Sequence, residues 1–217
     1  MGGRKVEEKS MGDATPAGGG TASERFRRAV ARFEAANDGD PVQVEVDGRQ
    51  RGREVVYARR VAAWIERLTQ GQGAASEALR LAAHCQHLCR WAIARGEYPA
   101  GRQGYLRWRE ALKKLHAQKA AAILQEVGYD AATIGRVETI VRKKNLAQDG
   151  EVQMMEDALC LFFLEEQFAD LAAKEGDKIV AIVQKTWAKM SPAGRAAALA
   201  LPLNAAEKAI VEKALQG

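Results

Sequence analysis

The fold class follows from one segment of the chain, which reads EVQMMEDALCLFFLEEQF at residues 151–168. Apolar side chains cover most of the helical circumference between Met154 and Leu164, a pattern that predicts a helix buried on nearly all sides. We therefore place the helix expected from residue 151 to about residue 174 at the centre of a helical bundle. Two glutamates end the apolar run well short of the length that crosses a membrane. The segment is a buried helix of a water-soluble protein.

Helical periodicity extends over most of the remaining sequence. Apolar residues recur at helical spacing in segments expected at residues 21–37, 54–68, 76–94, 103–127 and 131–145, and start signals predict two or three further helices after residue 176. Val42, Val44 and Val46 alternate with polar residues before Asp47-Gly48, which predicts a small hairpin or extended arm between the first two helices. The sequence shows no strand-helix alternation and no solenoid repeat. We expect an all-α fold.

Composition indicates one helical domain that follows a tail. The chain has 217 residues, of which 47% are hydrophobic and 28% charged, and a domain of this size buries a sufficient core without staples. Residues 1–20 contain six glycines and little to bury, so we expect a disordered tail over residues 1–22 and a helical domain over residues 23–217. Three cysteines, an odd number, favour a reducing compartment and a cytoplasmic protein.

Positive charge is concentrated in one part of the chain. The formal net charge is +5, yet residues 80–120 contain nine Lys or Arg against only Glu97 and Glu110. Acidic residues outnumber basic ones after residue 145. This asymmetry favours an anionic partner, whether a phosphate, a nucleotide or a nucleic acid, with a solvated basic surface as the alternative.

All three histidines lie on or beside apolar faces of two neighbouring helices. The i, i+3 spacing of His84 and His87 can offer two imidazole nitrogens to one ion. At least one carboxylate of Glu156 and Asp157 must be buried in the most apolar helix, where it needs a metal, a base or several donors. We expect a metal site that binds Mn, Fe or Zn, formed by His84, His87, His116 and Asp157. The alternatives are core histidines and an ion pair of the buried carboxylate with Arg60, Arg90 or Lys143.

Basic and aromatic residues surround these positions in the sequence. Guanidinium groups bind phosphate oxygens through paired hydrogen bonds, and ammonium groups bind them as point charges. We place Trp91 and Trp108 in the core, with long basic side chains reaching outward past them. The expected anion-binding residues are Arg90, Arg109, Lys113 and Lys143.

Several strings of the sequence resemble a known family. They read VVYARRVAAW at residues 55–64, LAAHCQHLCRW at 81–91 and GYLRWR at 104–109, and a later motif is EDA at 156–158. Together they resemble the bacterial and fungal domain of unknown function 4202 family over roughly residues 23–216. The helix order is more remotely similar to the HD superfamily of metal-dependent phosphohydrolases. That likeness implies functional positions at His116 and Asp157, whereas Gln86-His87 stands where the superfamily has His-Asp and Tyr57 where it has its first His.

The residues and the resemblance lead to one principal functional expectation. We expect an enzyme or enzyme-derived pocket that acts on a phosphorylated or nucleotide-like small molecule, with Asp157, His87 and His116 as catalytic residues. In the enzymatic version the metal or Asp157 polarises a water for attack on phosphorus. Two alternatives stay open: a basic nucleic-acid-binding protein with tRNA as its target, and a helical adaptor or dimerisation domain without a small ligand.

Overall fold

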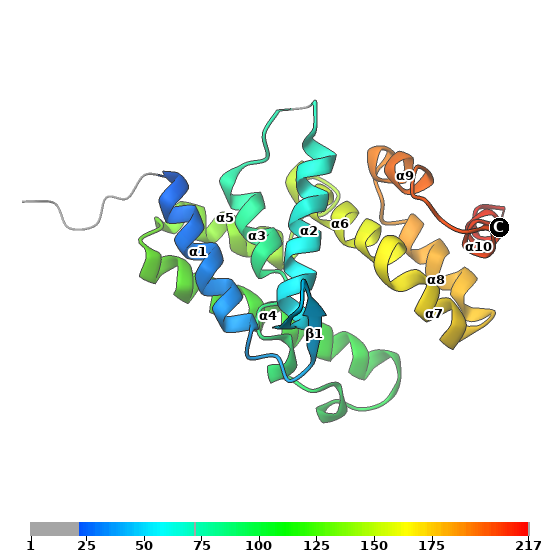
Figure 1. The fold of residues 1–217 in the computed structure, drawn as a ribbon, viewed down its shortest axis with the longest axis horizontal. Coiled ribbons are helices and arrows are strands. Elements are labelled where there is room, and N and C mark those ends of the chain that lie inside the picture. Colours follow the sequence, from blue (N-terminus) through cyan, green and yellow to red (C-terminus); the bar gives the residue numbers. More distant parts are fainter. Residues whose placement is uncertain (1–21, 72, 217) are drawn as a thin grey trace, which may run out of the picture.

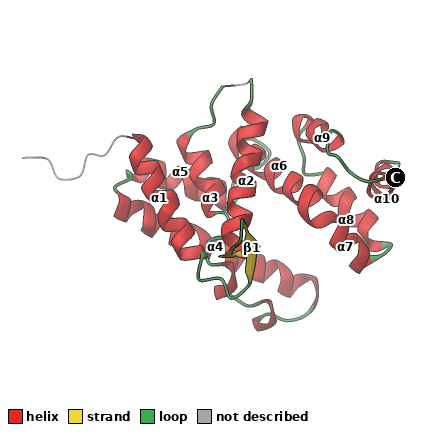
Figure 2. Ribbon diagram, in the orientation of Figure 1, coloured by secondary structure: helices red, strands yellow, loops and turns green. Residues whose placement is uncertain are grey.

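The computed structural model describes residues 22–71 and 73–216 (Figure 1). Helices make up most of these residues, so the fold is all-α, as predicted (Figure 2). The predicted tail over residues 1–22 lies outside the described residues except for residue 22, where the first helix begins. The α-helices are α1 (Ala22–Asn37), α2 (Arg53–Thr69), α3 (Glu77–Cys85), α4 (Gly101–Val127), α5 (Ala131–Val141), α6 (Gly150–Phe162), α7 (Phe168–Glu175), α8 (Lys178–Trp187), α9 (Pro192–Leu199) and α10 (Ala205–Leu215).

The alternating valines form a hairpin between α1 and α2. Strand β1 (Gln43–Val46) pairs antiparallel with β2 (Arg49–Gly52), and Val46 lies opposite Arg49. Asp47 and Gly48 both have positive φ, which is the backbone conformation of a two-residue hairpin turn. The predicted hairpin is therefore confirmed, and residues 38–42 connect it to the end of α1.

Helix α6 lies at the centre of the bundle, as its sequence predicts. It packs against α2, α3, α5 and α9, and Met155 and Leu161 are fully buried. Beyond Phe162 the helix widens into a π-helical turn, η3 (Phe163–Gln167), before α7 continues the same course. The single helix predicted from residue 151 to about residue 174 is thus present, with a local irregularity of a kind often found at functional sites.

The helix predicted over residues 76–94 is wrong in its second half. Helix α3 ends at Cys85, and a turn leads to a short 3-10 helix, η1 (Arg90–Ala92). Cys89 has a left-handed backbone, with φ of 53°, and its N–H donates to Oδ1 of Asn37 at 2.8 Å. A tertiary hydrogen bond therefore ends the helix where neither Gly nor Pro marks an end in the sequence. A second 3-10 helix, η2 (Arg95–Glu97), precedes α4.

The C-terminal helices α7 to α10 lie at one end of the long axis and α1 at the other (Figure 1). The prediction of two or three helices after residue 176 is confirmed by α8, α9 and α10. Within the described ranges, every helix is too short or too polar to cross a lipid bilayer.

Candidate functional site

A cavity of about 930 Å³ lies among α2, α4, α6, α7, α8, the hairpin and the segment after α3. We call it the central cavity, and its volume is within the range of small-molecule pockets. Both signs of charge line it among the described residues: the basic side chains are Arg53, Arg60, Arg90, Arg109, Lys143 and Lys189, and the acidic ones are Glu45, Glu54, Glu156, Glu166 and Asp170.

A smaller space of about 60 Å³, which we call the inner compartment, shares much of its lining with the central cavity. Its charged lining, among the described residues, is basic without any carboxylate. Polar but neutral side chains complete the wall, together with one leucine. The lining residues are Gln86, His87, Arg90, Arg109, Leu112, Lys113, His116 and Lys143. The sequence-predicted anion-binding residues therefore all lie around one small space.

His87 is held in one orientation by two neighbours on α2. Its Nδ1 lies 3.1 Å from Oε2 of Glu54, and its ring stacks on Tyr57 with centroids 4.0 Å apart and planes 5° from parallel. A carboxylate accepts hydrogen bonds, so Nδ1 carries the proton and Nε2 is the unprotonated nitrogen. Burial, followed by the charges of Arg90 and Lys143, holds the pKa of His87 well below its usual range. The imidazole is therefore neutral.

Glu54 is a buried carboxyl, only 4% exposed, at the start of α2. Burial raises its pKa, and the nearby guanidinium groups of Arg90 and Arg53 oppose that rise. Its backbone N–H donates to Oδ2 of Asp40 at 3.2 Å, so Asp40 caps the helix from a distance. The carboxyl is thus fixed at the helix N-terminus, where the helix dipole favours negative charge.

His116 supplies a second neutral imidazole from α4. Its Nδ1 lies 2.8 Å from the carbonyl oxygen of Leu88, and because a carbonyl only accepts, Nδ1 must carry the proton. Burial and the proximity of His87 lower the pKa of His116 to about 3. The two imidazole rings have centroids 5.7 Å apart. The inner compartment is therefore lined by two neighbouring imidazole rings, each with an unprotonated Nε2.

A buried ion pair joins Lys143 to Glu156 of α6. Their side chains are 13% and 7% exposed, and Lys189 lies 3.8 Å from the other oxygen of Glu156. Burial opposes ionisation of Glu156, but the ammonium of Lys143 outweighs it and lowers the pKa of this carboxyl. Lys143 has a left-handed backbone, with φ of 56°, in the connection that follows α5. The alternative of an ion pair between a carboxylate of this helix and Lys143 is thus confirmed for Glu156.

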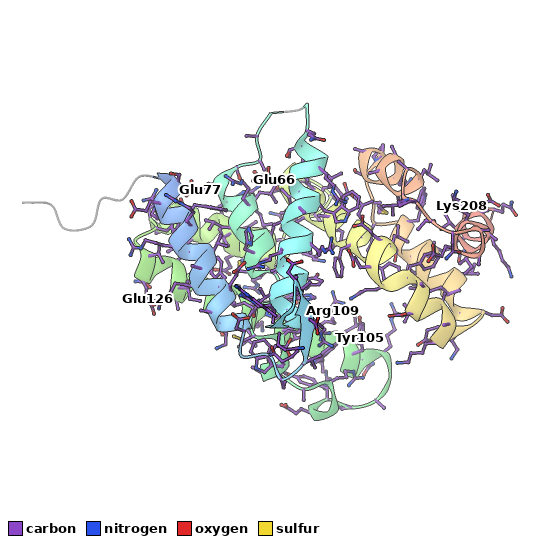
Figure 3. All side chains as sticks on the ribbon, viewed as in Figure 1. Glu66, Glu77, Tyr105, Arg109, Glu126 and Lys208 are labelled. Carbon is purple, nitrogen blue, oxygen red and sulfur yellow. The ribbon has the colours of Figure 1, made fainter. Side chains whose placement is uncertain are left out.

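The guanidinium groups of Arg90 and Arg109 lie against aromatic rings instead of carboxylates. That of Arg90 lies 5.0 Å from the ring centroid of Trp108, which is buried as predicted. Arg109 donates to the hydroxyl of Tyr105 at 3.0 Å, and the two side chains lie together on α4 (Figure 3). Neither arginine forms an ion pair within the described ranges, although Arg90 is close enough to oppose the rise in the pKa of Glu54.

The structure does not bring His84 to the other two histidines. Its ring lies edge-on to Phe26 of α1, with centroids 6.0 Å apart, and the residue lines neither the central cavity nor the inner compartment. Burial lowers the pKa of His84. The i, i+3 spacing predicted a shared helix face, but the helix ends at Cys85, between the two residues, and His87 leaves it in a different direction.

Asp157 also lies away from both cavities, although it is buried as predicted. Its carboxylate accepts from the backbone N–H of Ser191 at 2.8 Å, the hydroxyl of Ser191 at 2.5 Å and the side-chain amide of Gln153 at 3.0 Å. Several donors, rather than a metal, surround this acid. No cluster of three or more His, Cys, Asp or Glu side chains suited to a metal occurs in the described part of the chain. The four expected ligands therefore do not fit one ion.

Sequence reasoning missed Glu54, although a signal for it exists. Glu54, Ala58 and Val61 recur at i, i+4 and i+7, and all are buried on α2. An acid on the apolar face of a helix was expected to be buried in α6, and the same reasoning applies to Glu54 on α2. The pairing of Glu54 with His87, however, joins residues 33 positions apart and depends on the turn after α3.

The family model described as a domain of unknown function, DUF4202, matches residues 27–211. The chain belongs to the DUF4202 family. The matched range contains every residue that lines the central cavity and the inner compartment of this DUF4202 protein. No curated protein and no solved structure matches the chain. The similarity to the HD superfamily inferred from helix order stays a prediction.

Proposed function

We propose that this protein binds a phosphorylated small molecule and that the phosphoryl group occupies the inner compartment. The observation that supports the proposal is the charge of this space: Arg90, Arg109, Lys113 and Lys143 line it, and no described carboxylate does. Lys143 already pairs with Glu156, and Lys113 lies 3.8 Å from Glu110, whereas Arg90 and Arg109 form no ion pair among the described residues. Two guanidinium groups without such a partner repel each other unless an anion neutralises them. A bound anion therefore removes a cost that the free protein bears.

A phosphoryl group suits the donors better than a planar carboxylate does. Arg90 comes from η1, Arg109 from α4 and Lys143 from the α5–α6 connection, so donors reach the space from three directions. A tetrahedral anion offers oxygens in several directions, and guanidinium forks match pairs of them. The volume of about 60 Å³ suits a single such group, since one water needs only roughly 10–15 Å³ of the same kind of space.

The central cavity has room for the remainder of the ligand. Tyr57, Phe162 and Phe163 give it an aromatic wall, with the rings of Tyr57 and Phe162 edge to face at 4.7 Å. Acidic side chains nearby, including Glu45 and Asp170, can accept hydrogen bonds from hydroxyl or amino groups. This combination supports a nucleotide-like or sugar-like moiety attached to the phosphate.

The surface arginines bear on the alternative of nucleic-acid binding. Arg59 pairs with Glu34 at 2.7 Å and Arg80 with Glu66 at 3.0 Å. Arginines that carboxylates neutralise contribute little to the release of counterions from a nucleic acid. Arg90 and Arg109 line a cavity, which supports the phosphate proposal. Arg102, Arg107, Lys114 and Lys119 of α4 are exposed and form no ion pair among the described residues, so they are the surface that a nucleic acid would bind. Nucleic-acid binding and a ligand-free adaptor are outcomes that the following experiment distinguishes.

The test is a thermal-shift and calorimetric titration of the full chain with inorganic phosphate, ribose 5-phosphate and nucleoside 5′-monophosphates. We expect phosphate compounds to raise Tm, with a salt dependence of only about one or two counterions. Arg109→Gln should weaken binding by about 10- to 100-fold, the value of one charged hydrogen bond. Arg107→Gln is the matched control, because Arg107 is exposed on the same helix and lines neither cavity.

Two results would contradict the proposal. Equal loss of affinity in the Arg109 and Arg107 variants would show that general surface charge, rather than the inner compartment, binds the anion. Absence of any shift with the phosphate panel, together with tRNA binding that falls steeply with salt, would favour the nucleic-acid function. If neither phosphate compounds nor tRNA bind, the adaptor alternative gains support.

A further inference from the structure

We infer that the site also hydrolyses the phosphate monoester that it binds, with His87 as the general base and Glu54 as the residue that orients it. The inference rests on the proposed phosphate binding and goes beyond it, because binding an anion requires neither of these side chains. Four observations lead to it: the contacts of His87, their anchoring, the sign of the Glu54 charge and an unsatisfied acceptor on Gln86.

The first observation is that His87 has a fixed ring with one free nitrogen. Glu54 binds Nδ1 at 3.1 Å, and Tyr57 stacks on the ring face at 4.0 Å. Within the described ranges no hydrogen bond forms at Nε2, and His87 lines both the central cavity and the inner compartment. A carboxylate at one imidazole nitrogen fixes the tautomer that leaves the other nitrogen as a base.

A buried side chain anchors both members of this pair. Asn37, which is 1% exposed, accepts from the N–H of Cys89 at 2.8 Å and donates to the carbonyl of Glu54 at 3.5 Å. Gly52 allows this close approach, because a Cβ there would lie 2.2 Å from the carbonyl oxygen of Asn37. The end of α1 thus sets the position of the turn that carries His87 relative to the start of α2.

The charge of Glu54 argues against a site that only binds anions. A buried carboxylate costs free energy unless it has partners, and its negative charge repels a phosphate held nearby. A binding pocket would gain affinity by losing it. The direct contact of Glu54 with Nδ1 of His87 gives the acid a role that anion binding does not supply.

The pKa values support a base of this kind. Burial and the charges of Arg90, Lys143, Arg109 and Arg53 keep His87 unprotonated at neutral pH in the free protein. A bound phosphate dianion offsets those positive charges and raises the pKa of His87 toward the operating pH, where general bases are effective. The neighbouring His116 ring is held neutral as well, so it adds no competing charge.

Gln86 offers a second acceptor for the attacking water. Its amide nitrogen donates to the carbonyl of Val141 at 3.5 Å, while its buried Oε1 has no hydrogen-bond partner among the described residues. This oxygen is enclosed by the protein, so a water reaches it only when the Gln86 side chain turns toward the inner compartment, whose wall it forms. Turned in this way, Gln86 would offer its acceptor to a water held at Nε2 of His87, beside the space assigned to the phosphoryl group.

The reaction balances without a further reactant. The water oxygen forms a new bond to phosphorus as His87 takes one water proton at Nε2, and the bond from phosphorus to the ester oxygen breaks. The electron pair of that bond stays on the leaving oxygen, which takes a proton from solvent on the opposite side of phosphorus, and His87 releases its proton to solvent. Ester and water become alcohol and phosphate, while Arg90, Arg109 and Lys143 neutralise charge on the phosphoryl oxygens.

The test measures phosphate binding and monoester hydrolysis separately in the full chain. The substrates are p-nitrophenyl phosphate, ribose 5-phosphate and nucleoside 5′-monophosphates, assayed in the presence of EDTA. We expect His87→Gln to lower kcat by about 10²- to 10⁴-fold, the usual contribution of a general base, while inorganic phosphate binds within about threefold of the unmodified protein. The matched control is His84→Gln, which lies outside both cavities and should leave hydrolysis unchanged.

Glu54→Gln provides a second variant whose role is positioning. The glutamine oxygen still accepts from Nδ1, so kcat should fall less than in Glu54→Leu, and KM should stay within about threefold in both. Circular dichroism and Tm check that each variant folds. If the His87 variant does not fold, this pair of Glu54 variants decides the outcome.

Each result has a distinct meaning. Phosphate binding without hydrolysis of any ester on the panel would overturn this inference and leave the proposed function standing, whereas loss of both would overturn both. Equal kcat in the His87 variant and the unmodified protein would remove His87 from the chemistry. Hydrolysis that EDTA abolishes and Mn restores would also overturn the base role and favour the metal-dependent alternative predicted from the sequence.

Discussion

Replacing Asp157 with leucine tests whether this acid stabilises the fold or belongs to the functional site. The carboxylate accepts two hydrogen bonds from Ser191 and one from Gln153, and so joins α6 to the start of α9. Gln153 keeps its second acceptor, the carbonyl of Lys189 at 2.8 Å, and the Ser191 hydroxyl keeps the N–H of Gly194 at 3.0 Å. The backbone N–H and the hydroxyl O–H of Ser191 therefore both lose the carboxylate that accepts from them, without an evident replacement.

The structure gives the size of the effect. Loss of the charged hydrogen bonds from Ser191, partly offset by removal of a buried charge, costs about 3 kcal/mol. The leucine side chain is also crowded by α9. A Cβ built at Gly194 would lie only 2.6 Å from the Asp157 carboxylate, so little free space surrounds residue 157. For a chain of this length the expected decrease in Tm is roughly 10 °C. Phosphate binding should change less than about twofold, since Asp157 lines neither cavity.

Differential scanning calorimetry and urea unfolding measure the stability change, and calorimetric titration with inorganic phosphate measures binding. Asp177→Leu serves as the control, because Asp177 is an exposed acid without a side-chain capping bond, and its loss should stay within about 0.5 kcal/mol. A rise in Tm together with loss of phosphate binding would refute the reasoning. Asp157 would then be a site residue, as the sequence predicted, and the role assigned to Ser191 would be wrong.

Two further predictions concern the side chain that anchors the site and the loss of protein stability at acidic pH. Asn37→Ala leaves the N–H of Cys89 without its acceptor, so unfolding should become easier by about 1–3 kcal/mol; a urea titration measures this, and kcat should fall more than phosphate affinity. Hydrogen bonds from Arg136 lower the pKa of Asp149 to about 2 from an ordinary 3.8, so its carboxylate stabilises the fold fully above pH 4 and loses that contribution as pH falls toward 2. Tm measured across this range should therefore depend less on pH in Asp149→Asn, and an unchanged pH profile would contradict the assignment.

The helical elements could be predicted because they depend on local patterns. Apolar spacing and capping residues determine where α1, α2, α4 and α6 run, and burial of the apolar face of α6 sets the centre of the bundle. The end of α3 at Cys85 could not be predicted in this way, because its cause is the side chain of Asn37, which lies 52 residues from Cys89. The apolar spacing alone predicted that the helix continues to residue 94.

The candidate site was predicted in part. Sequence reasoning selected His87, His116 and the basic residues around them, and the structure brings these side chains to one compartment. It does not bring His84 or Asp157 there. Both were chosen because they lie on apolar helix faces, and a buried polar residue finds its partners on whichever element packs against it. For Asp157 that element is the start of α9, and for His84 it is α1.

The sequence by itself determined the all-α class, the hairpin, the central position of α6 and the presence of unusually placed polar residues. Only the tertiary structure decided which of those residues meet. The pairs Glu54–His87 and Lys143–Glu156, and the contact of Asp157 with Ser191 at the start of α9, join separate elements of the fold. Helical periodicity determines which face of each helix is buried, but the turn after α3 and the left-handed residues at Cys89 and Lys143 determine where the buried polar groups point. Those turns depend on contacts from distant parts of the chain, and this is why the chemistry of the site appears only in the folded molecule.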